Sequence, residues 1–189
     1  VAFDFKIKGH TTSANGYLGY LDDLRFYNIA ITEDLIQAIF SQEESSDIKS
    51  GNSNQIDLTS GLVAHYPLDG NASDMSGNGN DGTVYGATLG TDRHGQAQMS
   101  YEFDGTNDWI GLSQQIPDLE NFTLSAWFNG IGNIFYDSTE HSGNDFGVGF
   151  NEESGEIGLL ISKSGTRFAE TYDPQSYLKS GWNQVVFSL

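Results

Sequence analysis

The sequence predicts an all-β fold, an antiparallel β-sandwich with one short helix. Short runs of alternating apolar and polar residues recur along the 189-residue chain, and such alternation is typical of half-buried strands. The 23 Gly and only 3 Pro indicate many turns rather than long helices. A total of 12 Phe, 9 Tyr and 3 Trp supplies large aromatic side chains for a sandwich core. A chain of this length fits one large domain, or one domain plus a tail.

The charge of the chain excludes several classes of partner. With 8 basic and 26 acidic residues, the formal net charge is −18 at pH 7. Such a chain repels nucleic acid and anionic membrane surfaces, so neither is expected as a partner. An acidic surface also attracts divalent cations, although solubility alone explains it equally well. No apolar run approaches about 18 residues, so we expect a soluble chain without membrane insertion.

Two strands are expected near the start of the chain. Val1–Lys8 alternates apolar and polar residues, which predicts a half-buried strand. The polar stretch Gly9–Gly16 follows and ends in Asn-Gly, a favoured tight-turn pair. A second strand is expected over Tyr20–Tyr27, with Leu24 and Phe26 on the same face.

One convincing helix follows the second strand. Thr32 is placed to cap its N-terminus, and Glu33 and Asp34 put negative charge in its first turn, where the helix dipole favours it. Its apolar stripe consists of two i, i+4 pairs, Leu35/Ile39 and Ile36/Phe40. The next segment, Ser41–Ser60, is rich in Ser, Glu, Asp, Asn and Gln, a composition typical of a solvated linker.

Strands resume after the linker and continue to the end of the chain. The expected strands are Leu62–Pro67, Thr83–Tyr85, Ser100–Phe103, Trp109–Leu112, Phe122–Phe128 and Trp182–Leu189. Asp145–Phe150 and Glu156–Ser162 flank the turn sequence NEESG, which predicts a hairpin. Segments that form strands therefore lie on both sides of the linker.

Several separated motifs resemble a laminin G-like domain of the concanavalin A-like lectin/glucanase superfamily, a pentraxin-like jelly roll. The first two thirds of such a domain are resembled by GLVAHYPLDGNASDMSGNGNDGTVYGATLGTDRHGQAQMSYEFDGTNDWIGL, FTLSAWFNG and GWNQVVFSL. Its closing strand and short terminal helix are resembled by GYLGYLDDLRFYNIAITEDLIQAIF, which comes earlier in the chain. The resemblance therefore divides the chain into closing strands and helix (1–40), a polar linker (41–60) and opening and central strands (61–189). It implies a jelly-roll sandwich in an extracellular, secreted or cell-surface protein.

Three arrangements explain the inverted order. In a circularly permuted domain the linker joins the usual termini, and twenty flexible residues span roughly 25 Å on average. In a tandem array the chain holds the tail of one repeat and the body of the next, and exposed sheet edges would recruit a strand from a neighbouring repeat or copy. In the third arrangement the inverted order is an artefact of proteolysis or of artificial excision of the fragment. The family also places a hairpin between the strands that match Gln184–Leu189 and Phe3–Lys8, and no counterpart is evident here.

A Gly-rich loop with many oxygen-bearing side chains is a candidate calcium site. Alternating polar residues in it are Asp69, Asn71, Asp74, Ser76, Asn78, Asn80 and Asp81. Oxygen ligands on a tightly folding loop suit a hard cation such as Ca2+. The same residues are also ordinary loop formers, and no Glu follows at the twelfth position as in an EF-hand. The resemblance favours calcium, so Asp69, Asp74, Asn78 and Asp81 are its expected ligands.

Two further acidic pairs are candidate ligands. The resemblance implies that the closing strand runs beside the opening strand, which would bring Asp22 and Asp23 to the loop. The alternative is that Asp23 pairs with Arg25. Asn107 and Asp108 lie where pentraxins supply Asp and Asn to calcium, although a hairpin turn explains them equally well.

Aromatic residues are the candidate carbohydrate contacts. The residues that could stack on sugar rings are Trp109, Trp127, Trp182, Tyr66, Tyr85, Tyr101 and Tyr136. Most large aromatics in a sandwich belong to the core, as we expect for Trp182. Trp127 alternates away from Phe128 and is the best candidate for an exposed platform. Trp127, Trp109 and Tyr136 are the predicted ligand-binding residues.

No pattern in the sequence indicates catalysis. Retaining glycoside hydrolysis needs two carboxylates about 5 Å apart, but Glu152, Glu153 and Glu156 surround a predicted turn. The four histidines show no metal-type spacing, and the absence of cysteine excludes a thiol nucleophile. We therefore expect a non-catalytic extracellular module that binds carbohydrate or another cell-surface ligand with calcium. The alternative is a structural repeat of an adhesin or filament, which provides spacing and strand-based assembly.

Overall fold

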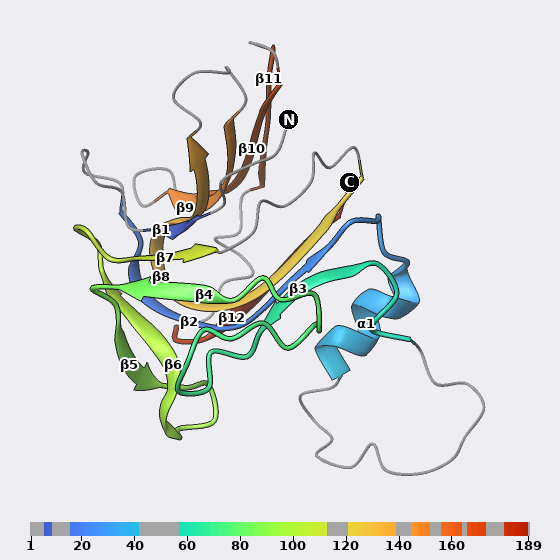
Figure 1. Cartoon of the computed structure of the whole chain (residues 1–189). Helices are drawn as coiled ribbons and strands as arrows, with labels where there is room; N and C mark the ends of the chain where they lie inside the picture. The colour runs from blue at the N-terminus through green and yellow to red at the C-terminus, as the bar shows by residue number, and fades with distance from the viewer. Residues whose placement is uncertain are drawn as a thin grey trace.

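The protein is an all-β antiparallel sandwich with one short helix, as the sequence predicts (Figure 1). The computed structural model describes residues 6–8, 16–41, 57–112, 121–138, 145–151, 156–163, 166–172 and 180–188. In chain order the elements are β1 (Lys6–Lys8), β2 (Leu18–Tyr27), α1 (Glu33–Ser41), β3 (Leu62–Tyr66), β4 (Gly82–Tyr85), β5 (Thr88–Thr91), β6 (Ala97–Asp104), β7 (Trp109–Leu112), β8 (Thr123–Ser138), β9 (Asp145–Asn151), β10 (Glu156–Lys163), β11 (Thr166–Tyr172) and β12 (Asn183–Ser188).

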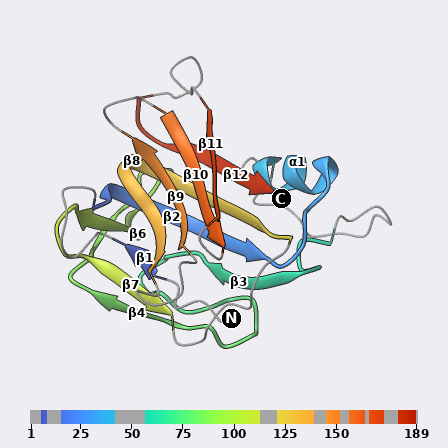
Figure 2. The ribbon, with the colours of Figure 1, turned by 90° about the horizontal axis from the view of Figure 1, so that it is seen from above.

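The strands form two sheets that share β8 (Figures 1 and 2). In the first, here called the long sheet, the order is β4-β7-β1-β8-β9-β10-β11. In the second, here called the forked sheet, β8 lies between β12 and β2. The other side of β2 pairs first with β6 and then with β3, and β6 also pairs with β5.

Glycine allows β8 and β2 to approach closely where β8 passes from one sheet to the other. A Cβ atom at Gly19 would lie 2.3 Å from the Asn129 carbonyl oxygen, and one at Gly130 would lie 2.3 Å from that of Leu18. A side chain at either position would separate the two backbones. Gly19 and Gly130, which lie just outside the two predicted strands, therefore permit β8 to continue beside β2 past Phe128, where the alternation of the sequence ends.

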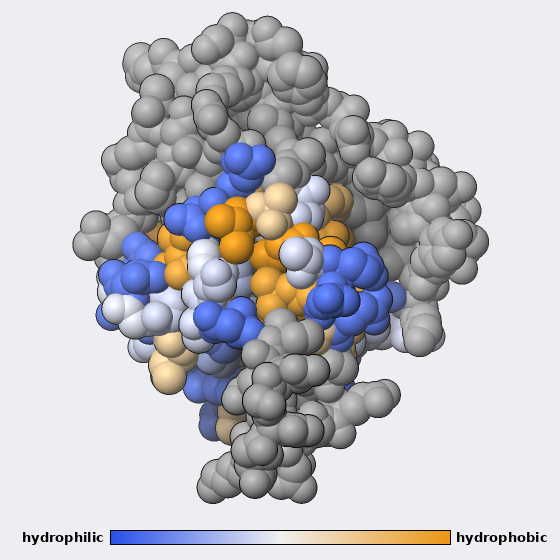
Figure 3. Space-filling view, turned by 90° about the vertical axis from the view of Figure 1, so that its right-hand side faces the viewer, coloured by the Kyte–Doolittle hydropathy of each residue, from blue (hydrophilic) through white to orange (hydrophobic). Residues whose placement is uncertain are grey.

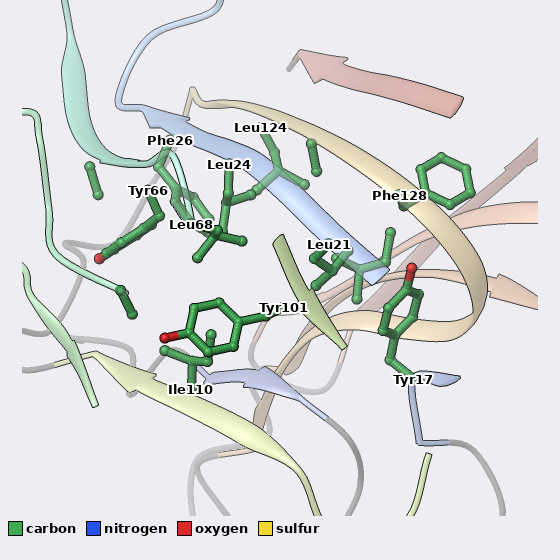
Figure 4. Packing of buried hydrophobic residues seen from close by; sticks show 14 of the residues in the cluster. Tyr17, Leu21, Leu24, Phe26, Tyr66, Leu68, Tyr101, Ile110, Leu124 and Phe128 are labelled. Carbon is green, nitrogen blue, oxygen red and sulfur yellow. The ribbon is translucent and has the colours of Figure 1, made fainter. Parts of the chain in front are cut away.

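The core lies between the two sheets (Figure 4). Leu21, Leu24 and Phe26 project into it from β2, and Leu124 projects from β8. Ile110 of the long sheet closes the core from the other side, and these five side chains are at most 2% exposed. Each such side chain contributes about 1.5–3 kcal/mol of hydrophobic stabilisation relative to exposure.

The N-terminal segment is part of both sheets. β1 lies between β7 and β8, while β2 lies between β8 and the pair β3 and β6. The N-terminal segment therefore pairs with strands that follow residue 60 in the same chain.

The helix begins where the sequence predicts. The Leu35 amide donates to Thr32 Oγ1 over 3.4 Å, and the Ile36 amide donates to the Thr32 carbonyl over 3.0 Å. Leu35 and Ile39 pack with Tyr27 in a second, smaller core. Phe40 is 40% exposed, so the other half of the predicted apolar stripe is only partly covered. On the side of the molecule that carries α1, apolar residues reach the surface among hydrophilic ones (Figure 3).

Some predicted boundaries differ from the structure. β5 and β11 were not expected, and β8 continues to Ser138 rather than ending at Phe128. β5 lacks apolar alternation because Gly90 lies against the Tyr20 ring, which a Cβ atom would approach to 2.7 Å. Residues 1–5 of the first predicted strand and residues 42–56 of the linker lie outside the described residues. In the described part of the chain, no helix is long and apolar enough to span a membrane.

Replacing Phe26 tests whether the N-terminal segment belongs to the cooperative core. Phe26 is 1% exposed, so Phe26→Ala should lower the free energy of unfolding by about 3–5 kcal/mol through lost burial and a residual cavity. Phe40→Ala, the matched exposed control, should change it by less than about 0.5 kcal/mol. Urea unfolding followed by Trp fluorescence measures both values. Equal, small effects would mean that β2 is not part of the folded core.

Candidate functional site

The residues predicted to bind calcium lie in three separate places. Asp22, Asp23 and Asp69 lie near the junction where β2 changes partners, and the charges of Asp23 and Asp69 both act on Asp22. The loop between β3 and β4 holds Asp74, Asn78 and Asp81, and the β6–β7 turn holds Asn107 and Asp108. Among the described residues, no group of three or more His, Cys, Asp or Glu is placed to hold a metal ion.

Asp74 organises the loop between β3 and β4. Its Oδ1 accepts hydrogen bonds from the amides of His65 (3.0 Å) and Ser76 (2.8 Å). Its Oδ2 accepts from the Asn80 amide (3.0 Å) and from Ser76 Oγ (2.8 Å). These bonds hold the pKa of Asp74 below its ordinary value, although partial burial opposes them. Both carboxylate oxygens therefore already serve the loop.

The same loop covers the edge of β3 that does not face β2. Asn78 Nδ2 donates to the carbonyls of Leu62 and Val63, each over 3.0 Å, and Asn80 Nδ2 donates to Val63 over 2.8 Å. The Met75 amide donates to the His65 carbonyl over 2.7 Å. Side chains and loop backbone thus replace a neighbouring strand, which protects the edge from pairing with another chain. This role explains the abundance of Asp, Asn and Ser without a cation.

The β6–β7 turn also uses its acidic residues internally. Asp108 is 6% exposed, and its Oδ2 accepts from the Asp104 amide over 2.8 Å. Asp104 Oδ1 accepts from the amides of Thr106 (2.8 Å) and Asn107 (3.4 Å). These are the hydrogen bonds of a tight turn.

A network of charged residues fills the junction in the forked sheet. The register of β2 shifts between Asp22 and Arg25, and Asp23 has a left-handed backbone with φ of 42°. Asp23 Oδ1 lies 2.8 Å from His65 Nε2, and its Oδ2 lies 3.0 Å from Arg25 Nη2. Asp22 Oδ2 lies 2.5 Å from Arg93 Nη1. The alternative expectation for Asp23, pairing with Arg25, is confirmed.

Burial and pairing move the pKa values of the two aspartates apart. Burial raises the pKa of Asp22 to about 6, and the positive charge of Arg93 limits the rise. Burial also acts on Asp23, but His65 and Arg25 outweigh it and hold the pKa of Asp23 below its ordinary value. Ion pairs of this kind offset their own desolvation rather than add much stability. The network therefore allows charged residues to occupy a buried junction between strands.

Trp127 faces this network. As the alternation predicts, Phe128 is buried in the core and Trp127 lies on the opposite face of the forked sheet, beside Asp22 in register. The Arg93 guanidinium lies 5.4 Å from the Trp127 ring centroid, a cation–π contact. The indole Nε1 has no hydrogen-bond partner among the described residues, and neither has Oε1 of Gln184, its cross-strand neighbour. With Arg93 against its ring, Trp127 is less suited to stacking on a sugar than its position in the sequence indicates.

Trp109, which is half-buried, instead forms an aromatic pair with the exposed Tyr85. The two rings are stacked, with centroids 3.9 Å apart and planes 7° from parallel. Both residues lie on the face of the long sheet opposite the core, because their neighbours Val84 and Ile110 pack inward. Tyr85 is 45% exposed and belongs to β4, which is the last strand of the long sheet. We call Tyr85 and Trp109 the aromatic pair.

The other aromatic residues predicted to contact a ligand lie in different parts of the sandwich. Tyr136 is in β8 and pairs in register with Lys6 of β1, so it belongs to the long sheet with the aromatic pair and not to the face that carries Trp127. The expectation that Trp182 belongs to the core is wrong, because its side chain is half-buried and its ring centroid lies 6.3 Å from that of Tyr20. Tyr66 and Tyr101 are buried in the core. Two of the three predicted ligand-binding residues, Trp109 and Tyr136, therefore share a sheet.

Sequence reasoning missed the partner of Trp109 and the role of Arg93. The signal for the aromatic pair was the alternation in GTVY and WIGL, which places Tyr85 and Trp109 outside when Val84 and Ile110 are inside. Arg93 gave no signal, because its pairing with Asp22 joins residues 71 positions apart.

Comparison with models of protein families found no match to this chain, and searches among curated proteins and solved structures found none either. The resemblance to laminin G-like domains therefore rests on the sequence motifs alone.

The Asp22 pKa can be measured directly. NMR titration of the side-chain carboxyl carbons should give a midpoint near pH 6 for Asp22, because burial disfavours its charged form. Arg93→Ala should raise that midpoint, since the guanidinium favours the charged form. A midpoint near the value of a free aspartate, or a fall in the variant, would contradict the geometry of the network.

The Asp74 contacts predict a structural rather than a metal-dependent role for this residue. Asp74→Ala should lower the free energy of unfolding by about 1–3 kcal/mol, because four donors lose their acceptor. Asn71→Ala, which removes an acceptor for the Ser73 amide alone, should cost less. Urea unfolding with calcium and with a chelator should give the same difference between wild type and Asp74→Ala. A loss that appears only with calcium would instead assign Asp74 to a calcium site.

Proposed function

We propose that the protein is a non-catalytic carbohydrate-binding module and that the aromatic pair is its stacking surface. The observation that carries this proposal is the exposed ring of Tyr85, which is stacked on Trp109 and lies on β4, the last strand of the long sheet. The C–H face of a sugar ring is apolar and flat, so it packs well against an aromatic face. Trp109 supports this use by fixing the orientation of the Tyr85 ring.

The surroundings of the aromatic pair favour binding over hydrolysis. Asp108 precedes Trp109, but it is buried and its carboxylate accepts from the Asp104 amide. Hydrolysis needs two carboxylates that flank the scissile bond, one of them free to donate a proton. The carboxylate next to the pair is committed to the turn, which supports a role in binding alone.

The charge of the chain favours an uncharged sugar. A net charge of −18 repels polyanions over the distance of a Debye length, so sulfated or uronate-rich chains are unfavourable ligands. We therefore propose a neutral glycan as the ligand. Calcium dependence and an extracellular location stay predictions from the resemblance.

Glycan binding by Tyr85→Ala tests the proposal. We expect the wild-type chain to bind neutral glycans on an array, and Tyr85→Ala to lose about tenfold or more in affinity because one stacked ring is removed. Phe40→Ala removes an aromatic ring of similar exposure on α1 and should leave the affinity unchanged. Calorimetric titration of the best array ligand measures all three affinities.

The same array, run with calcium and with a chelator, separates the remaining alternatives. Loss of every signal with the chelator would support the predicted calcium dependence. A blank array under both conditions would contradict the carbohydrate proposal and favour the structural repeat. Equal loss in Tyr85→Ala and Phe40→Ala would show that the aromatic pair is not the contact surface.

A further inference from the structure

A second aromatic surface lies on the outer face of the forked sheet. Leu21 of β2 pairs with Phe128 of β8 and with Tyr101 of β6, and all three side chains belong to the core. The register is continuous here, because the shift in β2 comes after Asp22. Consecutive side chains of a strand point to opposite faces. Tyr20, which comes just before Leu21 and is only half-buried, therefore points away from the core.

Three contacts fix the Tyr20 ring in place. Its hydroxyl donates to Glu102 Oε1 over 3.0 Å. Gly90 of β5 lies against the ring, since a Cβ atom there would be 2.7 Å from Cδ1. The Trp182 ring, also half-buried, lies 6.3 Å away between centroids, with the planes tilted by 51°. Rings held in this way lose little freedom when a ligand binds. We call Tyr20 and Trp182 the second aromatic pair.

Two polar groups on the same face have no partner among the described residues. Gln184 comes two positions after Trp182, and it pairs in register with Trp127 of β8. Trp127 Nε1 is a buried donor without an acceptor, and Gln184 Oε1 is a buried acceptor without a donor. Unmade hydrogen bonds of buried groups cost free energy, which a suitable partner would recover. The second aromatic pair thus lies beside one unused donor and one unused acceptor.

A hydroxyl group matches this donor and acceptor. Placed between the two side chains, it accepts from the indole N–H of Trp127 and donates to the amide oxygen of Gln184. The contact from Gln184 Nε2 to Ser125 Oγ is long, at 3.5 Å, so turning the Gln184 side chain toward a ligand costs little. A sugar supplies several hydroxyls beside an apolar C–H face, which suits the rings of the second aromatic pair. The chemistry of this face therefore fits a neutral sugar.

The two aromatic surfaces face in opposite directions. The aromatic pair is on the outer face of the long sheet, the second aromatic pair is on the outer face of the forked sheet, and the core lies between the two sheets. Packed sheets are about 10 Å apart, so the full thickness of the sandwich separates the two surfaces. A sugar chain that lies along one face does not reach the other. Each surface is therefore open to a chain of its own.

We propose that the protein carries two carbohydrate sites on opposite faces and cross-links neutral polysaccharide chains. The first site is the aromatic pair, and the second consists of the second aromatic pair with Trp127 Nε1 and the Gln184 amide. This inference rests on the proposed function and adds a second site and a valency of two.

Calorimetric titration of the full chain with neutral hexasaccharides built from glucose, mannose, galactose or N-acetylglucosamine tests the proposal. The tightest binder should saturate at two molecules per chain. Trp182→Ala and Tyr85→Ala should each bind one molecule, because each variant loses a ring on a different face. Trp182→Phe keeps an aromatic ring and should still bind two. Gln184→Ala should weaken one of the two sites by about threefold to tenfold, because one hydrogen bond is lost.

NMR of the wild-type chain gives a second readout that needs no variant. The same hexasaccharide should shift the indole N–H signals of both Trp109 and Trp182. Saturation at one molecule, with a shift at Trp109 but not at Trp182, would overturn this inference and leave the aromatic pair as a binding site. A shift at Trp182 alone would overturn the two-site inference and also the assignment of binding to the aromatic pair. Absence of binding by every hexasaccharide would overturn both proposals.

Light scattering tests the cross-linking itself. Wild type mixed with a soluble polymer of the same sugar should scatter strongly, because each chain joins two polymers. Trp182→Ala and Tyr85→Ala should bind the polymer without this rise. Equal scattering by wild type and by both variants would contradict cross-linking through the two faces.

Discussion

The pairing of β2 is the interaction on which the rest of the structure depends. β2 joins β8 on one side and both β6 and β3 on the other, so it holds together strands from distant parts of the chain. Leu21, Leu24 and Phe26 of this strand also supply the centre of the core. Removing β2 would open the forked sheet along its middle and expose backbone groups on three other strands. A segment that comes first in the chain is thus the element that closes the fold.

The change of partner along β2 imposes a cost that the charged network offsets. At the point where β6 gives way to β3, β2 bulges against β8 between Asp22 and Arg25, and Asp23 takes a left-handed conformation. The groups left at such a fork have to be satisfied locally, and here His65, Arg25 and Arg93 pair with the two carboxylates. At the edge of β3 that does not face β2, the side chains of Asn78 and Asn80 likewise form hydrogen bonds that a neighbouring strand would otherwise make. Most acidic and amide groups that resemble metal ligands are therefore used to complete sheets.

The sequence predicts the sandwich, the helix and most strands well, because alternation and capping are local signals. Thr32 caps α1 as expected, and Leu24 and Phe26 share a buried face. The site is less predictable, because its contacts join distant residues. Asp22 meets Arg93, and Tyr85 meets Trp109, through sheet register that no local pattern encodes. Composition likewise cannot distinguish a polar loop that binds a cation from one that covers a strand edge, since both use Asp, Asn and Ser.

Amide hydrogen exchange in β2, measured by NMR on the isolated chain, tests the central claim most directly. β2 pairs with β8, so the two strands should unfold as one cooperative unit. The backbone amides of Leu21, Leu24 and Phe26 in β2 should therefore exchange with the same free energy of opening as the amide of Leu124 in β8. Protection that rises and falls together in the two strands as denaturant is added would support the account. Rapid exchange throughout β2, with β8 still protected, would contradict the account. The other strands would then keep their fold without β2.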